Sequence, residues 1–249
     1  MHHFVVEAGA IDGTVVRFSP AQRHQITRVL RLRDGDEVVA LDGRGAQHRV
    51  RLIAGTTEVA GEIVAPVTAC HEPERRVALL VAPPRGERWA WLLQKGTEIG
   101  VARFVPLSTR YSQPGSTTIR PRHHEIVREA VEQCRRLLMP EIATPQPFAQ
   151  ALRAAANAAG TTIVLWEGHG DDTLAAVLGA GSADEAAEVR LVVGPEGGFH
   201  PDEVALAREL GIAVAGLGSL ILRSETAALV AAAIALHAAS AASQRSLSS

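Results

Sequence analysis

Short apolar segments alternate with helical patterns from residue 77 to residue 243, and this alternation constrains the fold more than any other feature of the chain. The segments "VALLVAP", "TTIVLWEG" and "EVRLVVG" are examples, and each precedes a helical pattern. Strands that are apolar throughout are buried on both faces, and strands joined through helices run parallel. The pattern predicts an α/β domain over residues 77–243, with helices on both faces of a mostly parallel sheet.

The first part of the chain has a different pattern, in which short strands surround a single helix. Ser19 and Pro20 favour a helix start, and Ile26 and Val29 belong to the apolar stripe of that helix. Asp-Gly pairs then mark turns between strands. We predict a small β-barrel domain over residues 1–68.

The two remaining segments have no periodic pattern. Residues 69–76 include Pro73 and join the two predicted domains, so we assign them as a linker. Residues 244–249 are polar and lie at the end of the chain, so we expect a disordered tail.

Composition excludes several classes of protein. No apolar run reaches the ~20 residues that a membrane helix needs, and the N-terminus lacks the pattern of a signal peptide. Cys70 and Cys134 are far apart and form no CxxC motif, which argues against a zinc site or a disulfide framework and favours a cytoplasmic protein. The pair His123-His124 has no acidic or cysteine partner at ligand spacing, so an exposed helix start or a contact to RNA phosphate is favoured there over a metal site.

The charge distribution suggests a nucleic-acid contact, although the net charge is only −2. The segment from Arg17 to Arg33 also contains Arg23, Arg28 and Arg31, and it has no acidic residue. A local basic patch binds phosphate even when the net charge of the protein is near zero. Lys95 is the only lysine, so a GC-rich genome is an alternative explanation for the abundance of arginine.

Three strand ends carry unusual loops, namely residues 165–172, 193–203 and 217–226. In open α/β sheets, ligands bind beyond the carboxyl ends of the strands. Glycine lets the backbone approach a ligand closely. Neither the Walker motif nor GxGxxG is present, so a neutral or zwitterionic ligand fits better than a phosphate. "GPEGG" could also be only a tight strand-to-helix connection.

The third of these loops, "LGSLILRSET", places an apolar "LIL" between glycine and a helix start. Ser224 is a candidate N-cap, and Glu225 would favour the positive end of the helix. Arg223 is unfavourable beside a helix N-terminus on electrostatic grounds. It is either a solvated side chain or a charge directed at an anionic ligand or substrate.

Together, "VGPEGGFHPDEV" and "LGSLILRSETAALVAAAIAL" resemble the signature of the SPOUT methyltransferases. The closest resemblance is to the bacterial 16S rRNA (uracil-N3) methyltransferases, and it covers nearly the whole chain. It implies a C-terminal α/β domain with a deep trefoil knot and an N-terminal PUA-like barrel. One departure is Arg135 in "EQCRRLLMPEI", which stands where the family usually has glycine.

The resemblance implies that S-adenosylmethionine binds among the three loops. The residues expected to contact it are Leu165, Glu167, Gly194, Pro195, Gly197, Gly198, Leu217, Gly218, Leu220, Ile221, Leu222 and Thr226. The expected RNA contacts are Arg17, Arg23, Arg28, Arg31, Arg33 and Arg136.

The expected reaction is methylation of N3 of a uridine in 16S rRNA, with the 30S subunit as the expected partner and a homodimer as the expected assembly. Uracil N3 carries a proton, so a base or a nearby cation would assist its attack on the methyl group. We expect Arg223 to stabilise the developing negative charge on the base carbonyls or to position the phosphate. Glu196 is a candidate base, but it could equally be structural, and a structural role is favoured for Glu225.

Two other functions remain compatible with the sequence. One keeps the fold but transfers the methyl group to a ribose 2′-oxygen of tRNA or rRNA. The other is a non-catalytic RNA-binding assembly factor that retains the pocket.

Overall fold

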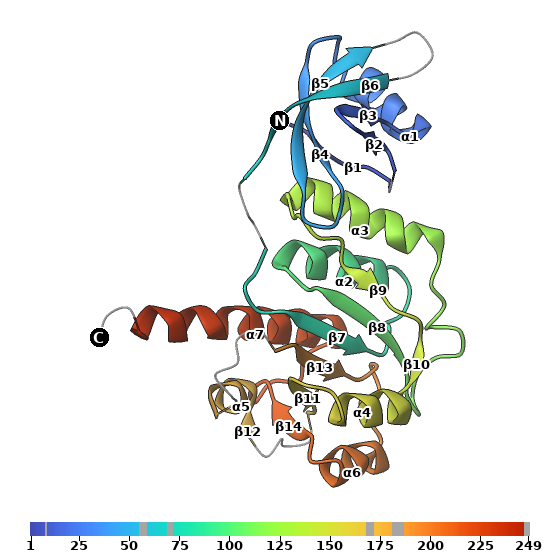
Figure 1. Cartoon of the computed structure of the whole chain (residues 1–249). Coiled ribbons are helices and arrows are strands. Elements are labelled where there is room, and N and C mark those ends of the chain that lie inside the picture. The colour runs from blue at the N-terminus through green and yellow to red at the C-terminus, as the bar shows by residue number, and fades with distance from the viewer. Residues whose placement is uncertain (8, 55–58, 69–71, 168–171, 181–186, 247–249) are drawn as a thin grey trace. The chain divides into compact units, whose positions relative to one another are not determined.

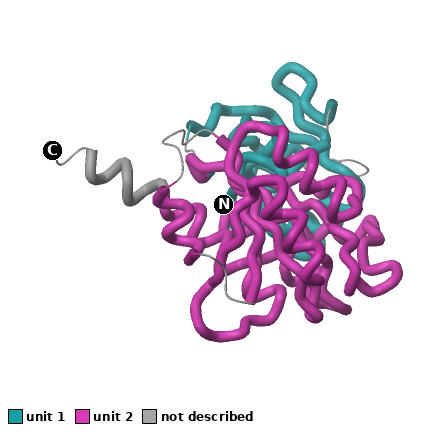
Figure 2. Tube along the Cα trace, turned by 90° about the horizontal axis from the view of Figure 1, so that it is seen from below, with its two compact units in different colours: residues 1–72, 128–139 teal, residues 73–127, 140–249 magenta. Residues whose placement is uncertain are grey.

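The computed structural model describes residues 1–7, 9–54, 59–68, 72–167, 172–180 and 187–246. The chain divides into two compact units, coloured separately in Figure 2. Unit 1 comprises residues 1–72 and 128–139, and unit 2 comprises residues 73–127 and 140–249. The sequence pattern did not reveal that a later segment of the chain returns to the N-terminal unit.

Unit 1 contains a six-stranded sheet in the order β1-β4-β5-β6-β3-β2 (Figure 1). All pairs are antiparallel except β1 with β4. The elements are β1 (His3–Val5), β2 (Ile11–Asp12), β3 (Val15–Arg17), α1 (Pro20–His24), η1 (Gln25–Val29), β4 (Glu37–Leu41), β5 (Gln47–Ala54) and β6 (Val59–Pro66).

The helical segment of unit 1 begins as predicted but continues differently. Ser19 and Gln22 form a capping box, with Pro20 at the first helical position. From Gln25 the segment widens into the π-helix η1. This change moves Val29 off the apolar face, and its side chain is 63% exposed, so its placement in the apolar stripe was wrong.

Residues 128–139 complete the core of unit 1. Val131 and Leu137 are buried in one cluster with Val39 and Leu41 of β4. Arg135 has a φ of 64°, in the left-handed region where glycine has no steric penalty. This conformation accounts for the glycine that the resembling family usually has at this position.

Unit 2 contains a parallel sheet in the order β10-β8-β7-β13-β11-β14-β12, with β9 paired to β8. The elements are β7 (Val77–Val81), α2 (Glu87–Ile99), β8 (Arg103–Ser108), α3 (Pro121–Cys134, from Arg128 onward in unit 1), β9 (Glu141–Ile142), β10 (Gln146–Pro147), α4 (Phe148–Ala156), β11 (Thr161–Leu165), β12 (Asp172–Thr173), α5 (Leu174–Ala180), β13 (Val189–Val193), α6 (Pro201–Glu209), β14 (Ala213–Gly216) and α7 (Ser224–Ser246).

Helices cover both faces of this sheet, as the apolar strands predicted. On one face, α4 and α6 pack on a cluster that includes Leu80, Val192 and Val214. On the other face, α7 packs on β7, β13 and α2. Gly96 of α2 lies so close to β8 that a Cβ there would be 2.7 Å from the ring of Phe104.

Helix α7 extends through Ser246, so residues 244–246 are helical rather than part of the predicted tail. An alanine-rich sequence favours such an extension because alanine has the highest helix propensity. Residues 247–249, and residues 69–71 of the predicted linker, lie outside the described residues. No helix in the described part of the chain has the length and apolar character needed to cross a membrane.

Candidate functional site

Three neighbouring strands bring the predicted loops to one edge of the sheet of unit 2. β11 pairs with β13 on one side and β14 on the other, with Leu165 opposite both Val193 and Ala215. The strands are parallel, so the segments after them leave the sheet at the same edge. We call residues 194–200 the glycine loop and residues 217–223 the LIL loop.

A cavity of about 280 Å³, here called the three-loop cavity, lies where these segments meet. It is lined by Leu165, Trp166, Glu167, Val193, Gly194, Pro195, Glu196, Gly198, Leu217, Gly218, Ser219, Leu220, Ile221, Leu222, Arg223, Ser224 and Ala227. Of the residues predicted to hold the cofactor, all but Gly197 and Thr226 line it.

The two exceptions have plain structural reasons. A Cβ at Gly197 would be 3.3 Å from Cβ of Tyr111, so this glycine packs against another segment. Thr226 is exposed in the first turn of α7. Trp166, Ser219 and Ala227 also line the cavity but were not predicted, although each is close in the chain to a residue that was predicted.

The glycine loop has the close approaches that require glycine. Gly198 has a φ of 70°, and a Cβ on it would lie 2.3 Å from Oε1 of Glu167. A Cβ on Gly194 would lie 3.2 Å from the backbone of Gly198 and 3.3 Å from the ring of Phe199. These close approaches go beyond a generic tight turn, because side chains here would displace the wall of the cavity.

Ser224 holds the LIL loop against the glycine loop. It is buried, and its Oγ donates a hydrogen bond of 2.7 Å to the carbonyl oxygen of Gly194. Ser224 was predicted to be the N-cap of the last helix, whereas the structure places it as the first residue of α7. Its hydroxyl instead links two loops that are 30 residues apart in the chain.

Glu196 is a tether between strand ends. Its Oε1 accepts a hydrogen bond of 3.0 Å from the backbone N–H of Arg85, which follows β7. The same oxygen lies 3.7 Å from Nη1 of Arg88. Neither partner lines the three-loop cavity, and these contacts favour the structural alternative for Glu196 over the catalytic base.

Arg88 also pairs with Glu225, at 3.6 Å between Nε and Oε1. The side chain of Glu225 is only 9% exposed, and its Oε2 has no hydrogen-bond partner within the described residues. Glu225 therefore depends on Arg88 for charge compensation, in agreement with the structural role favoured for it.

Arg223 is exposed at the rim of the three-loop cavity and makes no ion pair with any residue that the structure describes. Leu220 and Ile221 beside it are 78% and 85% exposed. Water contact of this extent is unfavourable for large apolar side chains in a loop, and a flat apolar ligand would relieve it. The site thus combines apolar walls, backbone polar groups and one cation without an acidic partner among the described residues.

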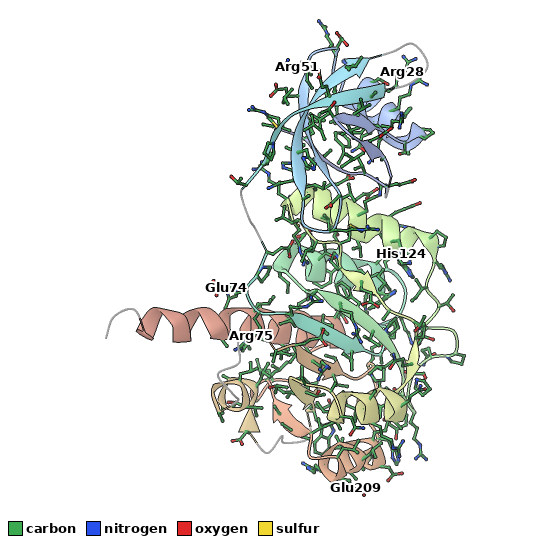
Figure 3. All side chains as sticks on the ribbon, in the orientation of Figure 1. Arg28, Arg51, Glu74, Arg75, His124 and Glu209 are labelled. Atoms are coloured by element: carbon green, nitrogen blue, oxygen red, sulfur yellow. The ribbon has the colours of Figure 1, made fainter. Side chains whose placement is uncertain are left out.

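The predicted RNA contacts all belong to unit 1 and differ in exposure. Arg17, Arg28, Arg31 and Arg33 are exposed, and Arg23 is half-buried. Arg28 projects outward from η1 (Figure 3).

The prediction that Arg136 contacts RNA was wrong, because its side chain is only 4% exposed. Its guanidinium donates two hydrogen bonds to Oε2 of Glu72, at 2.8 and 3.2 Å. Glu72 also accepts the backbone N–H groups of Leu137 and Leu138. Arg136 therefore stabilises the turn after α3 and is not available to RNA.

The remaining polar candidates have local explanations. Nζ of Lys95 lies 2.8 Å from Oε1 of Glu98, in a partly exposed ion pair within α2. Burial, followed by the nearby charges of Arg120, His124 and Arg122, lowers the pKa of His123. No group of three or more His, Cys, Asp or Glu residues suited to a metal occurs in the described segments.

Comparison with known proteins agrees with this geometry. The model of the RNA methyltransferase domain family matches residues 71–236. The chain is 32% identical, over 92% of its length and 75% of the relative's, to ribosomal RNA small subunit methyltransferase E of Synechocystis sp.. The Bacillus subtilis protein of the same name is 27% identical over 84% of each chain.

A solved structure of a relative has the same fold and holds a bound ligand. It is the ribosomal RNA small subunit methyltransferase E of Neisseria gonorrhoeae bound to S-adenosyl methionine. Its TM-score is 0.80 and its sequence identity 28%, with 94% of this chain and 95% of that chain covered.

These matches confirm the α/β fold class and the family that the two loop motifs predicted. The chain belongs to the ribosomal RNA small subunit methyltransferase E family, and its RNA methyltransferase domain carries the three-loop cavity.

Proposed function

We propose that this protein uses S-adenosylmethionine to methylate N3 of a uridine in 16S rRNA. The observation that carries the proposal is the coincidence, in one cavity, of the glycine loop, the apolar LIL loop and the cation Arg223. The relatives that share the fold are named as small-subunit rRNA methyltransferases, and one of them binds S-adenosyl methionine.

The residues of the three-loop cavity fit an adenosyl ligand. A Cβ at Gly198 would meet Glu167 and a Cβ at Gly194 would crowd Phe199, so glycine at both positions keeps the loop backbone where it can hydrogen-bond a ligand directly. Leu217, Leu220 and Ile221 offer apolar walls for a flat base. Glu167 offers carboxylate oxygens as acceptors for hydroxyl groups.

When bound, S-adenosylmethionine supplies an electrophilic methyl group. The chain contributes alignment, since displacement requires the acceptor nitrogen about 3–3.5 Å from that carbon. Arg223 contributes positive charge at the rim, where it favours the uracil anion left when the N3 proton departs. Glu196 keeps the glycine loop in place through Arg85 and does not take the proton.

The test is transfer of a labelled methyl group to 30S subunits, naked 16S rRNA and tRNA, followed by mass spectrometry of the nucleosides. N3-methyluridine from 16S rRNA is expected. A ribose 2′-O-methyl product, or no product despite intact RNA binding, would establish one of the rival functions instead.

Arg223→Ala tests the role of the cation. Methyl transfer should fall while calorimetric binding of S-adenosylmethionine stays unchanged, and Arg223→Lys should recover part of the rate. Arg153→Ala removes another exposed arginine, on α4, as the matched control. Loss of cofactor binding in Arg223→Ala would refute a role confined to the acceptor.

We also infer that the enzyme is a homodimer and works in the cytoplasm on the 30S subunit or its precursor. Trp91 of α2 and Val230 of α7 are 44% and 37% exposed, and the two helices pack together. Sedimentation should give twice the monomer mass, and a Trp91→Glu, Val230→Glu double variant should give the monomer.

A further inference from the structure

A second cavity lies beside the three-loop cavity on the same edge of the sheet. We call it the arginine cavity; its volume is about 400 Å³. It is lined by Pro84, Arg85, Gly86, Glu87, Trp89, Ala90, Gln113, Pro114, Gly115, Ser116, Thr118, Arg120, Arg122 and His123. None of these residues belongs to the basic segment from Arg17 to Arg33 that was predicted to bind RNA.

The topology explains why the two cavities are neighbours. The lining segments follow β7 and β8, and β7 pairs with β13, whose end begins the glycine loop. One hydrogen bond joins the walls of the two cavities. Glu196 of the three-loop cavity accepts the backbone N–H of Arg85 of the arginine cavity at 3.0 Å.

The lining has an excess of positive charge. Arg85, Arg120 and Arg122 are all exposed, and Glu87 is the only acidic residue in the lining. Arg122 lies 3.6 Å from Glu87, but both side chains are more than two-thirds exposed, so this pair is weak. Within the described residues, neither Arg85 nor Arg120 makes an ion pair. Such a cluster of guanidinium groups suits a phosphate, which accepts paired hydrogen bonds from arginine.

Backbone groups and one hydroxyl add to this character. Gly86, the N-cap of α2, has no side chain to cap the first N–H groups of that 13-residue helix. The 14-residue helix α3 begins at Pro121, so its positive end also meets the cavity. Oγ of Ser116 is buried and has no hydrogen-bond partner within the described residues. Ser116 lines the arginine cavity, so this hydroxyl is a candidate partner for a ligand oxygen.

His123 is a further donor at this wall. Its Nδ1 accepts the backbone N–H of Arg120 at 3.2 Å, so the neutral ring carries its proton on Nε2. Its ring packs edge-to-face on Trp89, which fixes its orientation, at 6.3 Å between centroids. His124, the next residue, is labelled in Figure 3 at the start of α3.

We infer that the arginine cavity binds a backbone phosphate of the RNA substrate, next to the nucleotide that enters the three-loop cavity. The inference rests on the proposed function for the identity of the polymer. Phosphate contacts fix the register of a nucleic acid without reading its sequence, so this cavity would position the target nucleotide and not select it.

The variants are Arg120→Gln and Arg122→Gln, separately and together. Both side chains are exposed, so their removal leaves the core intact. The matched control is the double variant Arg76→Gln, Arg153→Gln, which removes two exposed arginines of unit 2 that line neither cavity.

The first measurement is the affinity for a 16S rRNA transcript as a function of salt. The cavity variant should bind about tenfold more weakly or worse. Its slope of log Kobs against log salt should be shallower by about 0.7 for each phosphate that the protein no longer neutralises. The control should keep the wild-type slope, and calorimetric binding of S-adenosylmethionine should be unchanged in all variants. Equal affinity and slope in the cavity variant and the control would overturn the inference.

The second measurement does not depend on catalysis or on the target sequence. The dinucleotide UpU, which contains one phosphodiester, is titrated while the ring signals of His123 are followed by NMR. UpU should shift them saturably in the wild type but not in the cavity variant, and uridine should have no effect. An equal response to uridine and UpU, or none to either, would overturn the inference.

The two proposals can fail separately. If no RNA is methylated but UpU shifts His123, the proposed function fails and the phosphate site stands. If methylation occurs and the cavity variant behaves as the control, only the phosphate site fails.

Discussion

Substituting Gly198 by alanine tests whether the glycine loop is built around Glu167. With φ at 70°, alanine at this position costs about 1–2 kcal/mol of backbone energy. The new Cβ would also lie 2.3 Å from Oε1 of Glu167, too close for both atoms to stay. Glu167 is exposed, so its side chain can turn away at little further loss of stability.

Gly211→Ala is the matched control, because Gly211 has a φ of 69° and nothing within 4 Å of a Cβ. The two variants should lose the same stability, about 2–8 °C in Tm for a chain of this size. Only Gly198→Ala should lose affinity for S-adenosylmethionine, since it displaces Glu167. The loss of a hydrogen bond to a charged group corresponds to about 10- to 150-fold in Kd.

Calorimetry with S-adenosylmethionine and thermal unfolding give the two quantities. A Glu167→Ala, Gly198→Ala double variant completes the cycle, because removing the carboxylate removes the clash. The second substitution should then weaken binding by less than it does alone. Wild-type affinity in Gly198→Ala, or additive losses in the double variant, would refute the reasoning.

Three further substitutions address stability. Ser224→Ala should lower the free energy of unfolding by about 1–3 kcal/mol in urea, with an unchanged m-value, because it deprives a buried carbonyl of its donor. Burial raises the pKa of Glu132, so its contribution to stability is present at low pH and lost as pH rises through the folded-state pKa. Glu132→Gln should therefore gain stability relative to the wild type as pH rises above 4.5, the ordinary pKa of glutamate, and a pH-independent difference would contradict this. Arg88→Gln should lower the free energy of unfolding by about 1 kcal/mol because it leaves Glu225 unpaired, and the 44% exposure of Arg88 keeps this loss small. Adding Glu225→Gln to the same chain should restore the lost stability, because the unpaired charge is then removed.

Local sequence was sufficient to predict the strand ends and their loops. The strands are apolar throughout because both faces are covered, and the glycines mark positions such as Gly198, where the backbone is left-handed and a Cβ would displace Glu167. The strand order could not be derived from the same patterns. The resemblance of the loop motifs to a known family implied a knotted α/β domain but no strand order, and the comparisons then confirmed the family.

The roles of charged side chains were harder to predict, since they depend on residues far away in the chain. Arg136 pairs with Glu72, 64 residues away, and this pairing turned an expected RNA contact into a buried structural one. The apolar stripe failed at Val29 for a different reason, because widening to a π-helix changes the period on which the prediction depended. Neither event leaves a signal in the local pattern.

Glu196 shows how such a distant contact gives a glycine loop its shape. Glycines allow the close approach of the backbone, but they also increase the freedom that the loop loses on folding. A carboxylate that accepts the N–H of Arg85, 111 residues away, offsets part of that freedom by fixing the loop to the end of β7. The same bond ties the wall of the three-loop cavity to that of the arginine cavity. A glutamate in the middle of "GPEGG" therefore contributes to the site as a tether, because its hydrogen bond fixes the distance between the walls of the two cavities in which the methyl donor and the substrate backbone are proposed to bind.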